Sequence, residues 1–197
     1  ISGGTITTIA GKGLAGALDS EITVATEATM TFPSGIALDS SGNVFYCDTN
    51  NHAIYMVTPD GKISKVAGEG VSGYRTTDEY DSTKTDDENF LAVEAYLNFP
   101  VGIAIASDGT VYIADTKNHR IRKVNSKGFI ETVAGTGTAG FSGDGGKATD
   151  ARINNPMGMS FDSAGNLYFA DTFNHRIRQI TPAGAEARRV GKECRSE

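Results

Sequence analysis

The sequence has few cysteines, no tryptophan and no long apolar segment. Only Cys47 and Cys194 are present, which is too few for a disulfide framework or a cysteine-based zinc site. The longest apolar run spans residues 101–106, whereas a membrane-spanning helix needs roughly 18 consecutive apolar residues. These absences exclude a disulfide-stapled scaffold and predict no transmembrane helix.

An excess of basic charge is also lacking. The 197 residues include 18 Lys and Arg against 24 Asp and Glu, for a net charge of −6. Residues 69–94 hold eight acidic and two basic side chains, so this one segment carries the net charge and the rest of the chain is balanced. Nucleic-acid binding requires a concentrated basic surface. We therefore expect no nucleic-acid partner, and an RNA-binding function is disfavoured.

Glycine, in contrast, is abundant at 24 residues, and it marks the turns of an internal repeat. Residues 33–52, 100–120 and 156–176 align without gaps, and in each copy 15 residues separate the first Pro from the Asp of an Asp-Thr pair. An Ala-Gly pair precedes each copy, and its Ala lies 23, 33 and 22 residues before the Pro. The middle copy therefore carries an insertion, which falls in the acidic segment.

Each copy predicts four short strands, because runs of β-branched and aromatic residues alternate with turn sequences such as Pro-Asp-Gly. A four-stranded antiparallel meander of this size cannot bury both faces alone, and radial stacking of such sheets gives a β-propeller. We expect one all-β domain over residues 1–197. Its expected parts are a spare outer strand at 1–11, blades at 33–70, 100–137 and 156–191, a poor outer strand in the third blade, and an off-pattern tail at 192–197.

The turn after the second strand of each copy carries a recurring motif, Asp-Thr followed by Asn51-His52, Asn118-His119-Arg120 and Asn174-His175-Arg176. This motif, with the Val-Ala-Gly strand end that follows it, resembles the NHL repeat. The loop at residues 136–150 is similar to the long loop of secreted and teneurin-like members of that family. The resemblance implies a propeller, usually of six blades, and slightly favours a secreted or extracellular location. Ala53 in place of Arg and Cys47 in place of Ala depart from the pattern.

Three blades are half of a six-bladed ring, and two arrangements follow. In one, two chains join head to tail as a homodimer, and the N-terminal strand of each chain completes the last blade of its partner. In the other, the chain is part of a longer propeller and forms an open arc.

The polar residues that recur once per copy are expected to have structural roles, because equivalent positions lie on a circle around the propeller axis instead of converging on a ligand. The acids that precede each blade are expected to lie on single helical turns and to pair with Arg120 or Arg176. Apolar residues three positions later, Met30, Leu97 and Ile153, are expected to plug the blade junctions. The recurring polar residues are Asp48, Asn51, His52, Asp115, Asn118, His119, Arg120, Asp171, Asn174, His175 and Arg176, with the acids Glu27, Glu94 and Asp150.

The long loops between blades share one face with the Asp-Thr turns, since alternate connections of a meander emerge at the same end, and loops on a rigid scaffold usually carry binding. We expect this loop face to be the binding face. Asp144 supplies one carboxylate, far fewer than the six to eight oxygens that calcium requires, so no metal and no cofactor is expected. The candidate binding residues are Tyr74, Arg75, Asp78, Glu79, Tyr80, Asp81, Phe141, Asp144 and Phe173.

Two functions remain open on the sequence. The first is a non-enzymatic binding module that presents the loop face to a protein, a peptide or a glycan, with no catalytic residue. The second is a propeller enzyme, similar to lactonases or lyases, with a metal ion in the central channel. The predicted inner strands carry almost no acid, Asn or His to build such a metal site, which favours the binding module.

Overall fold

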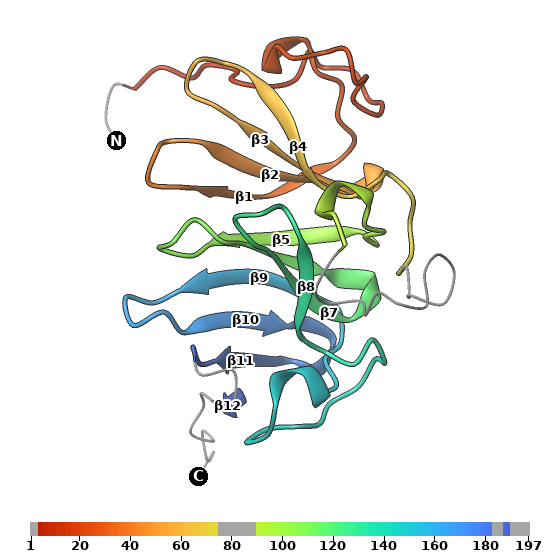
Figure 1. Ribbon diagram of the computed structural model, residues 1–197, viewed down its shortest axis with the longest axis vertical. Helices are drawn as coiled ribbons and strands as arrows, with labels where there is room; N and C mark the ends of the chain where they lie inside the picture. The colour runs from red at the N-terminus through yellow and green to blue at the C-terminus, as the bar shows by residue number, and fades with distance from the viewer. Residues whose placement is uncertain (1–3, 75–89, 183–186, 190–197) are drawn as a thin grey trace.

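The computed structural model describes residues 4–74, 90–182 and 187–189, and it contains three four-stranded antiparallel sheets (Figure 1). Consecutive strands pair in each sheet, so each sheet is a meander. The fold class predicted from the repeat is confirmed. The strands are β1 Pro33–Leu38, β2 Val44–Asp48, β3 Ala53–Val57 and β4 Ile63–Ala67 in blade 1, β5 Pro100–Ile105, β6 Val111–Asp115, β7 Arg120–Val124 and β8 Ile130–Ala134 in blade 2, and β9 Pro156–Phe161, β10 Leu167–Asp171, β11 Arg176–Ile180 and β12 Ala187–Arg189 in blade 3.

Short 3-10 turns lie at two places in the repeat. One set precedes each blade, as the sequence predicted: η1 Ala25–Glu27, η4 Ala92–Glu94 and η6 Ala148–Asp150. The other set joins the second and third strands: η2 Thr49–Asn51, η5 Thr116–Asn118 and η7 Thr172–Asn174. Each turn of the second set ends at a histidine in the left-handed conformation, with φ of 52°, 52° and 55°.

The first strand of each blade is its inner strand, and β1, β5 and β9 lie side by side. Blades 1 and 3 extend from these inner strands toward opposite ends of the view in Figure 1, with blade 2 between them. Gly35 and Gly102 allow this close approach, because a Cβ at either position would collide with the backbone carbonyl of Val101 or Met157 on the next inner strand.

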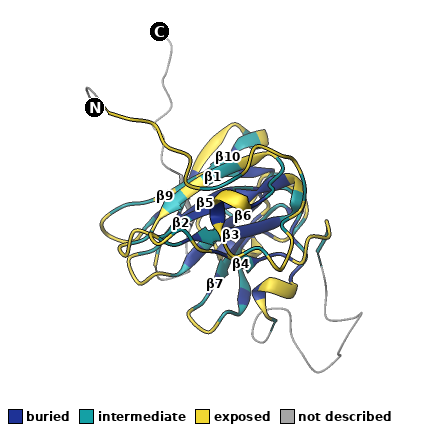
Figure 2. Cartoon of the chain, turned by 90° about the horizontal axis from the view of Figure 1, so that it is seen from above, coloured by how far each residue is buried: buried dark blue, intermediate teal, exposed yellow. Residues whose placement is uncertain are grey.

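The hydrophobic core forms three clusters, two at the blade junctions and one between blade 1 and the segment that precedes it, and buried residues follow the strands (Figure 2). The junction of blades 1 and 2 contains Ile54 and Leu97, and the junction of blades 2 and 3 contains the equivalent pair, Ile121 and Ile153. All four side chains are fully buried. The predicted plugging role of Leu97 and Ile153 is therefore confirmed, whereas the equivalent Met30 is only half-buried.

Strand positions that are buried at the internal junctions are exposed at the two ends of the three-blade array. We call the surface formed by Phe32, Pro33, Ile36 and Leu38 the leading face; the last two side chains are each 64% exposed, whereas the equivalent Ile103 is 5% exposed. We call the surface of blade 3 around Ile177 the trailing face; Ile177 is 54% exposed, and its equivalents Ile54 and Ile121 are buried.

The outermost positions of the arc differ from the regular blades. Residues 4–10 form no strand, because an outer strand needs a third strand beside it and none of the described strands pairs with them. The residue that follows them is nevertheless bonded as at the end of a regular fourth strand: the Gly11 N–H donates to the Ala25 carbonyl at 2.8 Å, as the Gly68 N–H does to the Ala92 carbonyl. In blade 3 the fourth position is occupied by β12, which spans three residues against five in β4 and β8.

Candidate binding face

The long inter-blade loops lie against the 3-10 turns of the second set, which places both on one face. The link is an asparagine in each blade, whose side-chain amide donates to a carbonyl of the loop and to the aspartate that precedes the turn. Asn51 bonds the Gly16 carbonyl, Asn118 that of Gly73 and Asn174 that of Gly140, at 2.5–2.8 Å, and each bonds its aspartate at 2.8 Å.

The three aspartates at this link are fully buried. Asp48, Asp115 and Asp171 each accept a backbone N–H from the end of the long loop, at 2.6–2.7 Å. Burial raises the pKa of Asp115 to about 6, although Arg122 and Asn118 favour its charged form. Burial also raises the pKa of Asp48, opposed by the hydrogen bonds from Asn51 and Thr31. These carboxylates hold loop to turn and leave no oxygen on the molecular surface.

The threonine and histidine of the first two turns contact the following blade. The Thr49 hydroxyl donates to the Pro100 carbonyl, and the Thr116 hydroxyl to the Pro156 carbonyl, both at 2.8 Å. His52 Nδ1 accepts the N–H of Phe99 at 3.1 Å, and His119 Nδ1 accepts that of Asn155 at 3.2 Å. Burial lowers the pKa of both imidazoles. The described histidines are therefore spread one per blade, with no convergence on a shared site.

Two arginines per blade enclose the aromatic residue of the long loop in blades 2 and 3. Tyr74 lies under the guanidinium groups of Arg120 and Arg122, at 4.1 and 5.0 Å from the ring centroid. Phe141 lies under those of Arg176 and Arg178, at 3.8 and 5.3 Å. We call each such trio an arginine clamp. Blade 1 has no clamp, since Ala53 and Tyr55 stand at the arginine positions.

The inner arginines of the clamps are buried, and they are not among the candidate residues that the sequence pattern indicated. Arg178 is 1% exposed, and it donates to the carbonyls of Arg152 and Ser142 at 2.9 Å and pairs with Asp144 at 2.8 Å and Asp171 at 3.4 Å. Arg122 is 4% exposed and lies 3.9 Å from Asp115. A signal was available: the Arg-x-Arg spacing occurs in two copies and is absent from the first.

The predicted pairing of the pre-blade acids with Arg120 or Arg176 is wrong for the described residues. Glu27, Glu94 and Asp150 are exposed on their 3-10 turns, and none of the ion pairs in the described part of the chain includes them. Arg120 instead donates to the carbonyls of Gly135 and Thr136, and Arg176 to that of Asn174. The outer arginines of the clamps therefore donate hydrogen bonds to backbone carbonyls of the loop and of the turn.

The candidate binding residues divide into three groups. Tyr74, Phe141 and Asp144 are engaged by the arginine clamps, although Phe141 remains 42% exposed. Phe173 lies on η7 at the loop face and is 58% exposed. Arg75, Asp78, Glu79, Tyr80 and Asp81 lie outside the described residues.

The described residues contain no cluster of three His, Cys, Asp or Glu side chains suited to a metal ion. Cys47 is fully buried, and burial raises the pKa of its thiol to about 12, so this thiol stays protonated at neutral pH. Within the same residues, none of the helices has the length and apolar character that crossing a bilayer requires.

Relatives in sequence share the repeat. Mouse teneurin-4 is 30% identical over 168 residues, which is 78% of this chain and 6% of teneurin-4. Chicken NHL repeat-containing protein 2 is 32% identical over 138 residues, 68% of this chain and 17% of that protein. The chain thus spans a small part of the length of these relatives.

Solved structures share the fold. A structural genomics protein from Bacteroides thetaiotaomicron has a TM-score of 0.61 at 25% identity, covering 88% of this chain and 38% of its own. A gluconolactonase from Xanthomonas campestris has a TM-score of 0.55 at 14% identity, covering 83% and 48%. A chain of the nidogen/laminin complex has a TM-score of 0.55 at 18% identity, covering 85% and 51%. Propellers that match this chain therefore include both an enzyme and a component of a protein complex.

A family model described as the teneurin NHL domain matches residues 10–125 and 63–144, which together take in the first two blades, the first two motif turns and both arginine-clamp aromatics. With the asparagine-histidine turn repeated in every blade of the structure, this chain belongs to the NHL-repeat propeller family.

Proposed function

We propose that the chain is a non-enzymatic binding module whose loop face contacts a protein, a peptide or a glycan. The observation that carries the proposal is that the buried polar residues of that face hold the structure together, whereas two of its aromatic residues remain exposed. Its buried aspartates, asparagines and inner arginines are used in holding loops to turns, whereas Phe141 and Phe173 remain 42% and 58% exposed. Exposed aromatic side chains on a rigid scaffold are typical anchors of binding interfaces.

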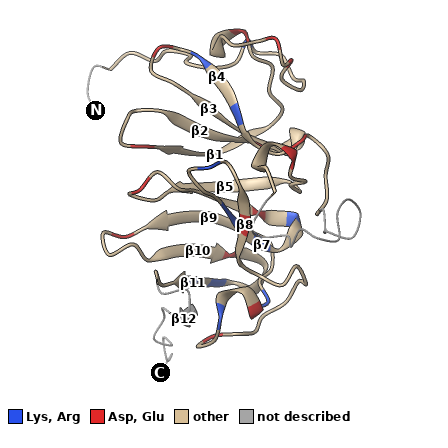
Figure 3. Ribbon diagram, viewed as in Figure 1, with Lys and Arg blue, Asp and Glu red and all other residues tan. Residues whose placement is uncertain are grey.

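The inner strands support the choice of a binding module over an enzyme. A propeller enzyme with a metal in its channel needs acids or imidazoles on these strands, yet β1, β5 and β9 read Pro-Ser-Gly-Ile-Ala-Leu, Pro-Val-Gly-Ile-Ala-Ile and Pro-Met-Gly-Met-Ser-Phe (Figure 3). Metal analysis of the purified chain tests this choice. A tightly bound metal ion at unit stoichiometry would contradict the proposal and favour the lactonase-like or lyase-like enzyme.

The anchoring role of Phe173 is tested by capture of ligands from a random peptide display library and from a glycan array. Phe173→Lys introduces the residue that blade 2 carries at the equivalent position, Lys117, so the turn should form normally. We expect captured ligands to lose affinity by at least about 10-fold, as is usual for an aromatic anchor. The matched control is Ala164→Lys, at an exposed apolar residue of the β9–β10 turn, which lies at the end of the meander opposite the loop face. Equal losses in both variants would refute the loop face as the binding surface.

We also propose that two copies pair head to tail as a homodimer, with residues 5–11 of each copy acting as the outer strand of the partner's blade 3. Residues 5–11 repeat the pattern of the β8 end, and their hydrogen bond to Ala25 matches that of a regular fourth strand to the next blade. The exchange would replace the three-residue β12. Two copies also match the length of one neighbouring propeller, since this chain covers 48% of the gluconolactonase chain and 51% of the nidogen/laminin chain.

A further inference from the structure

We infer that the trailing face of blade 3 binds the leading face of blade 1 in a second copy, with Ile177 entering the pocket beneath residues 10–15. This inference rests on the proposed pairing of two copies and gives it specific contacts. It is independent of ligand capture by the loop face. Three separate comparisons between the internal junctions and the two ends carry it.

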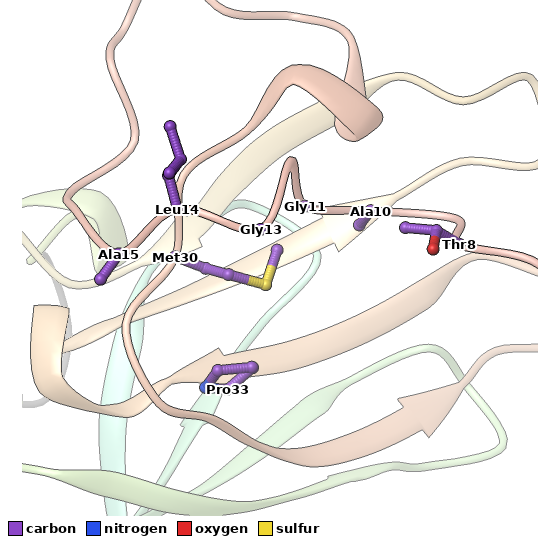
Figure 4. Close-up of a pocket in the computed structure, with 8 residues that line it drawn as sticks. All are labelled: Thr8, Ala10, Gly11, Gly13, Leu14, Ala15, Met30 and Pro33. Atoms are coloured by element: carbon purple, nitrogen blue, oxygen red, sulfur yellow. The ribbon is translucent and has the colours of Figure 1, made fainter.

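The first comparison is of apolar packing. A pocket of about 420 Å³ opens at the leading face, and Figure 4 shows Met30 extending beneath Gly11 and Gly13, between that segment and Pro33. The equivalents of Met30 at the internal junctions are Leu97 and Ile153, and these pack in the same clusters as Ile54 and Ile121. In blade 3 the position of these two isoleucines is occupied by Ile177, which is exposed. Ile177 is therefore the side chain that would pack on Met30 by the same pattern.

The second comparison is of hydrogen bonds. Each internal junction joins a threonine hydroxyl to a proline carbonyl and a histidine Nδ1 to the N–H of a residue with left-handed backbone. At the trailing face, within the described residues, the Thr172 hydroxyl has only a local bond of 3.4 Å, to the Ala170 carbonyl. At the leading face Phe32 has the matching φ of 58°, close to the 50° of Phe99. Thr172 and His175 of one copy therefore match Pro33 and Phe32 of another in donors and acceptors.

The third comparison is of backbone clearance. A Cβ on Gly35 or Gly102 would collide with the carbonyl of the next inner strand, but a Cβ on the equivalent Gly158 has none of the described atoms of its own chain within 4 Å. In the assembly that we infer, Gly158 faces the Ser34 carbonyl of the second copy. The glycine at this position then has the same role at the inter-chain junction as at the internal ones.

The two faces are different surfaces, so one contact between two copies leaves one face of each copy open. Closure requires the second contact to form at the same time, which gives a twofold ring of six blades.

Sedimentation velocity of the full chain across the micromolar range tests the inference. We expect a species of twice the 20.7 kDa chain mass. Ile177→Lys should weaken association by at least about 100-fold, because it buries an ammonium group at the interface. Gly158→Ala should also weaken association, although the single chain has room for the added methyl group. Val93→Lys, away from both faces, is the control and should leave the mass unchanged.

A charge swap separates the interface from general misfolding. Ile177→Lys and Met30→Glu should each be monomeric alone, since both junctions of either homodimer carry the altered residue. An equimolar mixture should recover the dimer, because one junction then pairs Lys with Glu and the other is unaltered. A monomeric unaltered chain would overturn both the pairing and its contacts. A dimer that survives Ile177→Lys and Gly158→Ala would overturn the contacts alone, and failed recovery in the mixture would do the same.

Discussion

At the scale of the residue, the same aspartate occupies three different electrostatic environments. Asp171 has Arg178 at 3.4 Å, Asp115 has Arg122 at 3.9 Å, and Asp48 has Tyr55 at the arginine position. A buried carboxylate is costly unless it is paired or hydrogen-bonded. In blade 1 the buried carboxylate is stabilised by hydrogen bonds alone, from Thr31 and Asn51. The repeat therefore fixes the position of the carboxylate more strictly than the identity of its partner.

Two histidines predict a pH dependence of stability. Burial lowers the pKa of His52 and His119 below the ordinary value of 6.5, and their Nδ1 atoms accept bonds only when unprotonated. The unfolded chain thus binds more protons than the folded chain below pH 6.5, so the stability that these residues contribute is present above pH 6.5 and is lost as pH falls through their folded-state pKa values.

The measurement compares the free energy of unfolding between pH 7.5 and pH 5.5, a range set around the imidazole pKa of about 6.5. His52→Asn with His119→Asn should give a shallower loss, since Asn tolerates the left-handed backbone and does not titrate. Asp115, with a pKa raised to about 6, has the opposite sign but remains in both proteins. An unchanged slope in the double variant would exclude the histidines as its cause.

At the scale of the element, the strands were predictable and the loop attachments were not. Turn sequences and Pro-to-Asp spacing set the limits of the strands, because glycine and proline positions recur in register. The pre-blade acids look like partners for Arg120 and Arg176 because opposite charges recur together. The arginines instead bond backbone carbonyls of the loop and the turn, and carbonyls are present in any sequence. Side-chain pattern alone gives no information about such contacts.

Removal of the buried arginine from the blade 3 clamp is expected to loosen the long loop that this arginine holds. Arg178→Met removes bonds to two loop carbonyls and leaves Asp171 buried with one cation fewer. We expect a loss of about 3 kcal/mol in the free energy of unfolding, as for other broken buried ion pairs, and faster amide hydrogen exchange in residues 140–155. Arg176→Met, at the exposed arginine of the same clamp, is the matched control with a smaller effect. Equal exchange in the two variants would refute a special role for the buried arginine.

At the scale of the whole molecule, stability depends on the junctions, because most of the buried apolar side chains lie there. The sequence predicted the number of blades and their stacking from the repeat. It did not predict that residues 4–10 lie outside any strand, since strand formation there depends on pairing with a neighbouring strand, and none of the described strands pairs with these residues. Pairing with a distant element is invisible in a local pattern.

Among the described glycines, Gly102 leaves the least room for a Cβ atom. Gly102→Ala would direct a methyl group at the Met157 carbonyl, so blades 2 and 3 must separate or the backbone must strain. We expect a loss of about 3 kcal/mol, at the upper end of the cost of overpacking, with a lower Tm and less cooperative unfolding by calorimetry. Gly158→Ala, studied where the chain is monomeric, should leave the Tm unchanged. A normal transition for Gly102→Ala would contradict the observed spacing of the inner strands.

The junction bonds also have a direction. The hydroxyl and imidazole always come from the earlier blade, and the backbone carbonyl and N–H always come from the later one. A duplicated blade placed at either junction would therefore meet on both sides the donors and acceptors that these bonds require. The size of such a protein can change by whole-unit duplication of its gene, with copy number as the variable and the chemistry of the contacts unchanged.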